Sequence, residues 1–235
     1  MTASAPPVTL VHGWGGSFAT TWQRSGFTAL LEDAGVSIIG VDLLGHGTAP
    51  KPHEPEAYAD LGARLLESLP DEPVDAVGFS LGAMTLLRVA IDHPERFHRI
   101  VLAGIGSNIF DRDESGTASI IAGLEAVAAG TDPSTLDNTV RLFTQYATQP
   151  GNDIEALTAV MKRPASPVIT PDDCARVTCP VLVVVGDKDF VYPADELAAA
   201  FADGRCETLR GVDHFATTES FGFFDAALEF LDAIS

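Results

Sequence analysis

Residues 74–87 constrain this chain more than any other stretch. They read as an apolar strand, a Gly-x-Ser-x-Gly turn over residues 78–82, and then a run that favours a helix. So sharp a turn holds Ser80 in a strained backbone conformation and leaves no room for side chains at Gly78 and Gly82. The pattern therefore predicts a nucleophile elbow, which lifts the serine hydroxyl clear of a sheet. An ordinary Gly/Ser turn is the alternative, because the five-residue pattern alone is common by chance.

Short apolar segments alternate with segments of helical periodicity along most of the chain. This alternation predicts a parallel sheet with helices on both faces, in which ligands bind beyond the carboxyl ends of the strands. A glycine-rich segment after the first strand and Ser80 are both expected at that end. Besides the strand and helix around Ser80, the expected strands span residues 8–11, 36–42, 99–104, 181–186 and 206–209, and the expected helices span residues 17–34, 58–69, 195–201 and 221–234.

Two motifs carry a resemblance to a known family. The segment His-Gly-Trp-Gly-Gly at residues 12–16, followed by the Gly-x-Ser-x-Gly turn, resembles the α/β-hydrolase superfamily, and the likeness extends over nearly the whole chain. It implies the α/β-hydrolase fold, with a mostly parallel sheet and helices on both faces. The chain opens almost directly at the strand before His12, so we expect the antiparallel hairpin that usually precedes this strand to be missing.

The strand pattern lapses between Phe110 and Pro171. Three helix-like stretches replace it, and Gly and Pro residues separate them. This resembles the small helical cap that many α/β-hydrolases carry over the active site. The resemblance divides the chain into a first core segment (residues 1–110), a cap (residues 111–171) and a second core segment (residues 172–235). The expected cap helices lie around residues 119–129, 134–148 and 153–163.

The resemblance also implies a catalytic triad. Its members are Ser80 as the nucleophile, His214 as the base that takes and returns the proton, and an aspartate that orients the histidine. The order Ser, Asp, His along the chain is that of the α/β-hydrolases. The family pattern Gly-x-x-Asp selects Asp189 over Asp187, although either could be a solvated turn residue.

Two backbone amides complete the implied site. In the family, the residue after His-Gly and the residue after the nucleophile donate hydrogen bonds to the oxyanion, and these are Trp14 and Leu81 here. The side chains of His12 and His46 are expected to be structural. No metal or organic cofactor is expected.

These residues point to a serine hydrolase that cleaves carboxylic esters of small molecules through an acyl-enzyme intermediate. A thioesterase, a carbon-carbon bond hydrolase or a cofactor-free haloperoxidase could use the same triad. A non-hydrolytic ligand-binding protein on this fold is the alternative from another class. The two motifs also resemble those of the carboxylesterases of biotin synthesis, which act on a carrier-bound ester. Carrier docking would need a basic surface, for which the cap offers Arg112, Arg141, Lys162 and Arg163.

Charge and composition exclude some partners. The net charge is -19 and the cations form no run, so nucleic acids and anionic membranes would be repelled. Residues 1–7 lack the charged start and apolar core of a signal peptide, and no apolar run could span a bilayer, so we expect a cytoplasmic protein. Three cysteines, Cys174, Cys179 and Cys206, suit reduced thiols. The acyl length, leaving group and oligomeric state are not fixed by the sequence.

Overall fold

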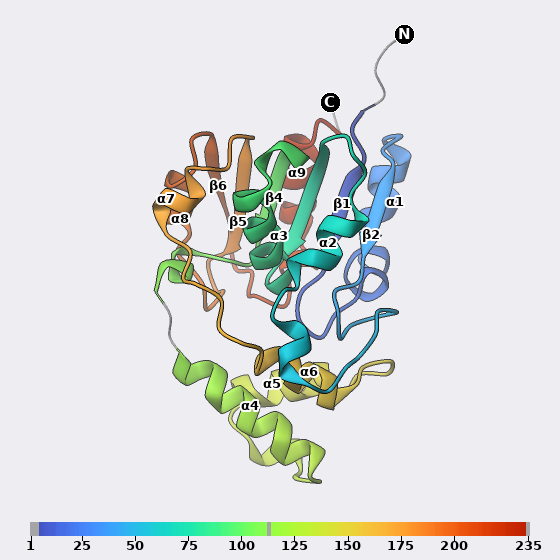
Figure 1. Cartoon of the computed structure of the whole chain (residues 1–235), viewed down its shortest axis with the longest axis vertical. Coiled ribbons are helices and arrows are strands. Elements are labelled where there is room, and N and C mark those ends of the chain that lie inside the picture. Colours follow the sequence, from blue (N-terminus) through green and yellow to red (C-terminus); the bar gives the residue numbers. More distant parts are fainter. Residues whose placement is uncertain (1–4, 112–113, 234–235) are drawn as a thin grey trace.

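A six-stranded sheet forms the centre of the molecule. The structure is a computed structural model that describes residues 5–111 and 114–233. Neighbouring strands are all parallel, in the order β2-β1-β3-β4-β5-β6 (Figure 1). The predicted fold class is confirmed, and no antiparallel strand joins the sheet within the described residues, as the missing hairpin predicts. The strands are β1 (Val8–Val11), β2 (Ile38–Val41), β3 (Val74–Phe79), β4 (Phe97–Ala103), β5 (Val181–Gly186) and β6 (Gly204–Leu209).

Helices cover both faces of the sheet, which explains why its central strands are apolar at almost every position. Along β4, Ile100 and Leu102 face one layer of helices, whereas Val101 and Ala103 face the other. Full burial of a large apolar side chain contributes about 1.5–3 kcal/mol to folding. The sheet is therefore a rigid base for the loops at its ends.

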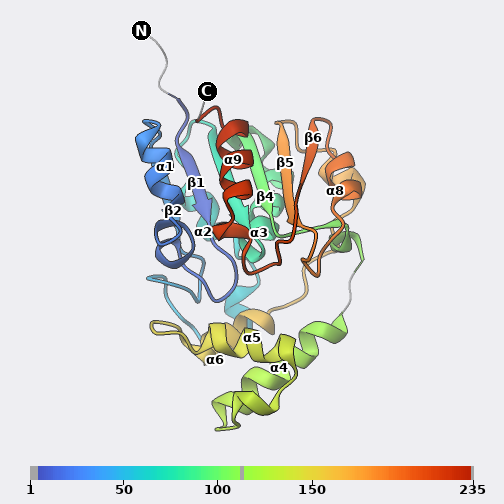
Figure 2. The ribbon, with the colours of Figure 1, turned by 180° about the vertical axis from the view of Figure 1, so that it is seen from behind.

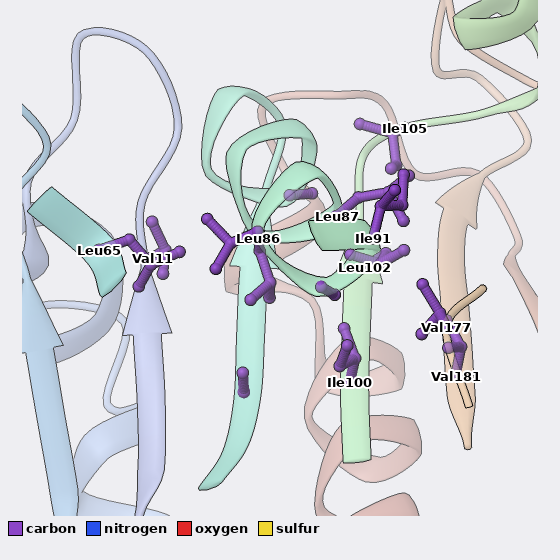
Figure 3. Packing of buried hydrophobic residues seen from close by; sticks show 14 of the residues in the cluster. Val11, Leu65, Leu86, Leu87, Ile91, Ile100, Leu102, Ile105, Val177 and Val181 are labelled. Carbon is purple, nitrogen blue, oxygen red and sulfur yellow. The ribbon is translucent and has the colours of Figure 1, made fainter. Parts of the chain in front are cut away.

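The first layer contains the helix that follows Ser80. In Figure 3, Leu87 and Ile91 of this helix lie near Leu102 of β4, and all three belong to one buried cluster together with Leu86. Leu65 and Leu197 join the same cluster from other helices of the layer. The helices of this layer are α2 (Gly62–Ser68), α3 (Leu81–Asp92), α7 (Pro171–Cys174) and α8 (Asp195–Ala199).

The second layer consists of α1 (Phe27–Asp33) and α9 (Phe221–Phe230), which lie in front of the sheet in Figure 2. Its centre is aromatic. Trp22 is fully buried, and its ring lies 5.6 Å from that of Phe27 and 6.0 Å from that of Phe223. This layer closes the face of the sheet opposite to α3.

The predicted helix over residues 17–34 is in fact two segments. A π-helical turn spans Phe18–Gln23, and α1 starts only after Gly26, whose φ of 87° belongs to the left-handed region that an α-helix cannot include. The predicted helix over residues 58–69 begins later than expected, as α2 at Gly62, after a 3-10 turn that ends at Tyr58. The 3-10 turns of the described residues are Pro55–Tyr58, Pro94–Arg96, Ser107–Phe110, Pro133–Thr135 and Thr217–Glu219.

The strand order changes direction at β1, and this places two of the predicted functional segments side by side. β1 pairs with β2 on one side and with β3 on the other, and Val11 at its end lies opposite Gly78 of β3. The segments that follow β1 and β3 therefore emerge next to each other. Ligands bind at such switch points in parallel sheets.

Three helices stand apart from the sheet layers. They are α4 (Glu114–Ala128), α5 (Asn138–Ala147) and α6 (Ile154–Met161), and they lie beyond the carboxyl ends of the strands (Figures 1 and 2). A small buried cluster joins them, formed by Leu124, Ala147 and Leu157. Ala159 and Val160 of α6 also belong to the buried cluster of the first layer, so α6 packs against the core near the carboxyl ends of the strands.

The three cysteines carry free thiols, as predicted. Cys174 and Cys179 are buried among the apolar side chains of the first layer. Burial raises the pKa of Cys174 to about 12 and that of Cys179 to about 11, because the thiolate is poorly solvated there. Both side chains therefore act as small apolar groups of the core.

Candidate active site

The turn at Ser80 has the strained form that the glycine pattern predicts. Ser80 has φ 52° and ψ -114°, a conformation that L-residues rarely adopt. A β-carbon on Gly78 would lie 2.7 Å from the Ala83 α-carbon, and one on Gly82 would lie 2.4 Å from the His12 carbonyl oxygen. Both neighbours are backbone atoms that cannot move aside, so only glycine fits and the serine hydroxyl is held at the end of β3.

Ser80, His214 and Asp189 form one hydrogen-bonded chain. The Ser80 hydroxyl lies 2.9 Å from His214 Nε2, and His214 Nδ1 lies 2.9 Å and 3.0 Å from the two Asp189 carboxylate oxygens. Because Nδ1–H donates to the carboxylate, Nε2 is free to accept the serine proton. His214 and Asp189 are both 6 % exposed, which excludes most competing water.

The acid turn after β5 separates the roles of two aspartates. Asp189 faces His214 and also accepts a hydrogen bond from the Val191 amide at 3.0 Å. Asp187 instead accepts from the Gly211 amide at 2.7 Å and so supports the loop that carries His214. The structure therefore brings Asp189, and not Asp187, to the histidine.

We call residues 13–16 the glycine loop. It lies against the serine, since a β-carbon on Gly13 would be 3.3 Å from that of Ser80. The amide N–H groups of Trp14 in this loop and of Leu81 at the start of α3 donate to no acceptor in the described part of the chain. Two unused donors beside a serine hydroxyl are the arrangement that an oxyanion requires.

The buried His12 supports the glycine loop from the core side, and the buried His46 lies beside it. His12 Nδ1 donates to the Gly13 carbonyl at 2.7 Å, and Nε2 accepts from the Leu43 amide at 3.1 Å. Burial lowers the pKa of His12 and lowers that of His46 to about 3, so both rings are neutral. Their rings lie 5.0 Å apart. Both side chains thus have a structural place, as the sequence indicates.

Asp42, at the end of β2, holds the neighbouring loops. Its carboxylate accepts from the Phe18 amide at 2.7 Å, from the Thr48 amide at 2.8 Å and from the Thr48 hydroxyl at 2.9 Å. Burial disfavours the charged carboxylate, but these donors outweigh burial and lower the pKa of Asp42 below its ordinary value. The loop after β2 is therefore fixed beside the site.

Aromatic side chains surround His214. Phe79 and Phe190 lie on the imidazole with ring centroids 5.1 Å and 4.4 Å away, and Phe215 meets it edge-on at 5.6 Å. A cavity of about 50 Å³ lies between the glycine loop, Phe79, Tyr146 and Phe215. Ligand sites commonly measure about 300–1,000 Å³, so this cavity has room for a small group only.

Some residues near the site are not indicated by the sequence. Phe190 is a large exposed aromatic side chain directly beside the imidazole, and the pattern around Asp189 does not reveal this contact. Asn152 bonds to the glycine loop from the turn between α5 and α6. It follows Pro150 and Gly151, which predict only a turn.

Within residues 5–111 and 114–233, no three His, Cys, Asp or Glu side chains gather so as to hold a metal ion. No helix in the same ranges is long and apolar enough to cross a membrane.

The family follows from a comparison with known proteins. Residues 10–233 match the model of the alpha/beta hydrolase family, and the chain belongs to this family. A pimeloyl-[acyl-carrier protein] methyl ester esterase of Aeromonas hydrophila is 27 % identical over 204 residues, which cover 80 % of this chain and 79 % of that protein.

Solved structures agree on the fold. A marine microorganism esterase matches with a TM-score of 0.70 and 21 % identity, over 97 % of this chain and 95 % of that one. A bromoperoxidase from Bacillus anthracis matches with a TM-score of 0.66 and 22 % identity, over 97 % and 92 % of the two chains. At such identities the likeness shows the fold alone, and the fold carries more than one chemistry.

Proposed function

We propose that this protein is a serine hydrolase that cleaves carboxylic esters of small molecules through an acyl-enzyme intermediate. The observation that carries the proposal is the hydrogen-bonded chain from the Ser80 hydroxyl through His214 to Asp189, with each step at 2.9–3.0 Å. A protein that only bound a ligand would have no need for all three groups in this arrangement. The esterase among the relatives supports the same conclusion.

The reaction would start with attack by Ser80 on the ester carbonyl carbon. As the Oγ–C bond forms, the serine proton passes to His214 Nε2, and Asp189 stabilises the imidazolium. The carbonyl oxygen becomes an oxyanion, which accepts hydrogen bonds from the Trp14 and Leu81 amides. A donor of this kind contributes about 2.7–4 kcal/mol in a comparable site.

The tetrahedral intermediate then breaks its bond to the leaving alcohol, which takes the proton from His214. The acyl group stays on Ser80 until a water molecule, deprotonated by His214, attacks it and releases the acid. These steps need only residues of this chain and water, so we propose no cofactor. We also propose that residues 111–171 act as a cap, with α4, α5 and α6 over the acyl site.

The test is hydrolysis of p-nitrophenyl esters of increasing acyl length by the purified protein and by Ser80→Ala. We expect turnover in the wild type and its loss in the variant, and the acyl length that is hydrolysed fastest reports the depth of the acyl site. Ser107→Ala is the matched control, since this buried hydroxyl has no hydrogen-bond partner among the described residues. An inactive but folded wild type, or activity that survives Ser80→Ala, would contradict the proposal.

A carrier-bound methyl ester is the second candidate substrate, because the Aeromonas hydrophila relative is a methyl ester esterase of an acyl-carrier protein. An acidic carrier would need a basic surface. Lys162 is already paired with Glu125, Arg141 donates to Asn138, and Arg112 lies outside the described residues. Faster cleavage of a carrier-bound methyl ester than of the free ester would select this candidate.

Other proposed properties rest on the sequence. A thioesterase and a carbon-carbon bond hydrolase use the same triad, and substrate panels that include thioesters and vinylogous diketones separate them from an esterase. We propose no nucleic-acid or membrane partner, because the net charge of -19 repels polyanions. A cytoplasmic location stays a prediction.

A further inference from the structure

The glycine loop has a second set of contacts, on the side away from the sheet. The Trp14 indole N–H donates to the Leu157 carbonyl of α6 at 3.1 Å, and the indole lies 5.4 Å from the Phe143 ring of α5. Trp14 also packs against the buried cluster of Leu124 and Leu157. The residue whose amide faces the oxyanion position is thus attached by its side chain to the cap.

Asn152 makes the more direct contact. Its side-chain amide donates to the Gly15 carbonyl and to the Tyr146 carbonyl, each at 2.8 Å. The –NH₂ group has two hydrogens, so each carbonyl receives one. Asn152 therefore joins the end of α5 to the glycine loop, over a sequence separation of 137 residues.

Two rigid peptide planes connect Asn152 to the oxyanion donor. The Gly15 carbonyl and the Gly16 N–H belong to one planar peptide unit, and the Gly13 carbonyl and the Trp14 N–H belong to another. The Gly16 N–H donates to the Gly13 carbonyl at 3.1 Å and links the two planes. The bond from Asn152 fixes the first plane, the first plane orients the second, and the second plane carries the Trp14 N–H.

We propose that Asn152 is a positioning residue that aims the Trp14 amide at the oxyanion when the turn between α5 and α6 is seated on the glycine loop. This rests on the proposed serine hydrolase function. The cavity of about 50 Å³ beside the glycine loop is also lined by Tyr146 of α5, whose carbonyl accepts the second Asn152 bond. Seating of this turn beside the cavity and orientation of the Trp14 amide are then one event.

The variant Asn152→Asp tests the proposal with almost no change of shape. A carboxylate oxygen replaces the –NH₂ group, loses both donated bonds and repels both carbonyl oxygens. Loss of a whole oxyanion donor costs about 10²–10³-fold in kcat, and a misdirected donor retains part of its effect. We expect kcat to fall about 10–100-fold with KM nearly unchanged, because the interaction operates in the transition state.

His53→Gln is the matched control. His53 lies 3.0 Å from Asp153 and 3.0 Å from Glu155 at the start of α6, so it holds the same part of the cap to the core without touching the glycine loop. We expect this variant to keep the wild-type kcat. An equal loss of kcat in both variants would mean that any loosening of the cap lowers activity, and would overturn the specific role of Asn152.

Phosphonylation of the serine makes the result independent of the choice of ester. p-Nitrophenyl methylphosphonate transfers its phosphonyl group to Ser80, the P–O bond to p-nitrophenolate breaks, and the developing charge uses the same amides. The rate of p-nitrophenolate release, with mass spectrometry to locate the group on Ser80, should fall about 10–100-fold in Asn152→Asp under conditions where circular dichroism shows the variant to be folded.

The outcomes separate the two proposals. If wild-type Ser80 reacts and Asn152→Asp reacts equally fast, the positioning role is wrong while serine chemistry stands. If the folded wild type reacts with neither the phosphonate nor any ester, the proposed function fails, and the role of Asn152 with it. Should Asn152→Asp not fold, Asn152→Ala removes both donors without adding a charge and is judged by the same criteria.

Discussion

The two sides of the candidate site are held in different ways. On the core side, Ser80, His214 and Asp189 are fixed by backbone contacts under the elbow and by buried hydrogen bonds. On the cap side, Ala159 and Val160 of α6 are buried with the core, but the polar contacts come from partly or fully exposed side chains such as Asn152 and His53. Buried contacts resist opening, whereas exposed ones break at little cost. We therefore expect the Ser80–His214–Asp189 geometry to be the more rigid of the two, and the orientation of the Trp14 amide to depend in part on the turn between α5 and α6.

The largest expected effect tests the core side. Asp189→Asn keeps the shape of the acid but removes the carboxylate that fixes the His214 tautomer, so kcat for ester hydrolysis should fall about 10⁴-fold, as for the equivalent change in a serine protease. Asp187→Asn is the matched control in the same turn and should retain most activity. Steady-state kinetics on one p-nitrophenyl ester measures both, and a larger loss in Asp187→Asn would contradict the assignment.

A smaller effect concerns the stability of the core side in acid. The folded pKa of His46 is lowered to about 3 by burial, while the unfolded ring titrates near its ordinary value of 6.5. The contribution of the neutral His46 to the free energy of unfolding is complete above pH 6.5. It is lost as the pH falls from 6.5 towards 3, because the unfolded chain takes up the proton first. Between pH 7.5 and pH 5.0 this removes about 2 kcal/mol from the free energy of unfolding.

His46→Asn can still donate to the Leu44 carbonyl, which His46 Nδ1 contacts at 3.0 Å, but it does not titrate. Urea unfolding at the two pH values should therefore show a loss about 2 kcal/mol smaller in this variant than in the wild type. His93→Asn is the control, because the half-buried His93 lies outside the apolar core and forms a 3.7 Å ion pair with Glu95. Identical pH dependence in wild type and His46→Asn would contradict the expectation.

The smallest expected effect tests the cap side. Here stability is lost as the pH rises, whereas for His46 it is lost as the pH falls. Asp153, followed by Glu155, raises the pKa of the exposed His53 above 6.5. Its contribution is therefore complete below pH 6.5 and is lost as the pH rises through the raised pKa. His53→Gln should lower Tm slightly at pH 5.5, by about 1 °C, and leave it unchanged at pH 9. Thermal unfolding followed by circular dichroism measures this difference in Tm. An equal Tm shift at both pH values would show that the His53 ring stabilises the cap by packing and not by its charge.

Most of the fold could be predicted because local signals agree with the tertiary structure. The alternation of apolar strands and helices predicts the parallel sheet, and the glycines at 78 and 82 predict the sharp turn before α3. The three predicted site residues, Ser80, Asp189 and His214, lie together in the structure. Their catalytic roles stay a prediction, as does the division of the chain into core and cap.

What the sequence does not predict depends on contacts between distant residues. Asn152 looks like a turn residue, and only the folded chain shows its bond to Gly15. His53 lies among prolines, and its partners on α6 are about 100 residues away. The break at Gly26 is local, but a single glycine inside a helical pattern is often tolerated, so its left-handed φ was not evident.

The attachment of Trp14 to the cap also has a consequence for tryptophan fluorescence. The chain has two tryptophans in different environments. Trp22 lies in the aromatic core beside α9, and Trp14 is bonded to α6 of the cap. If the cap lifted, the Trp14 indole would move from the Leu157 carbonyl into water, and its fluorescence emission would shift to longer wavelength. The emission of the buried Trp22 would not change. In a Trp22→Phe background, the emission wavelength would therefore report whether the Trp14 indole is in contact with α6.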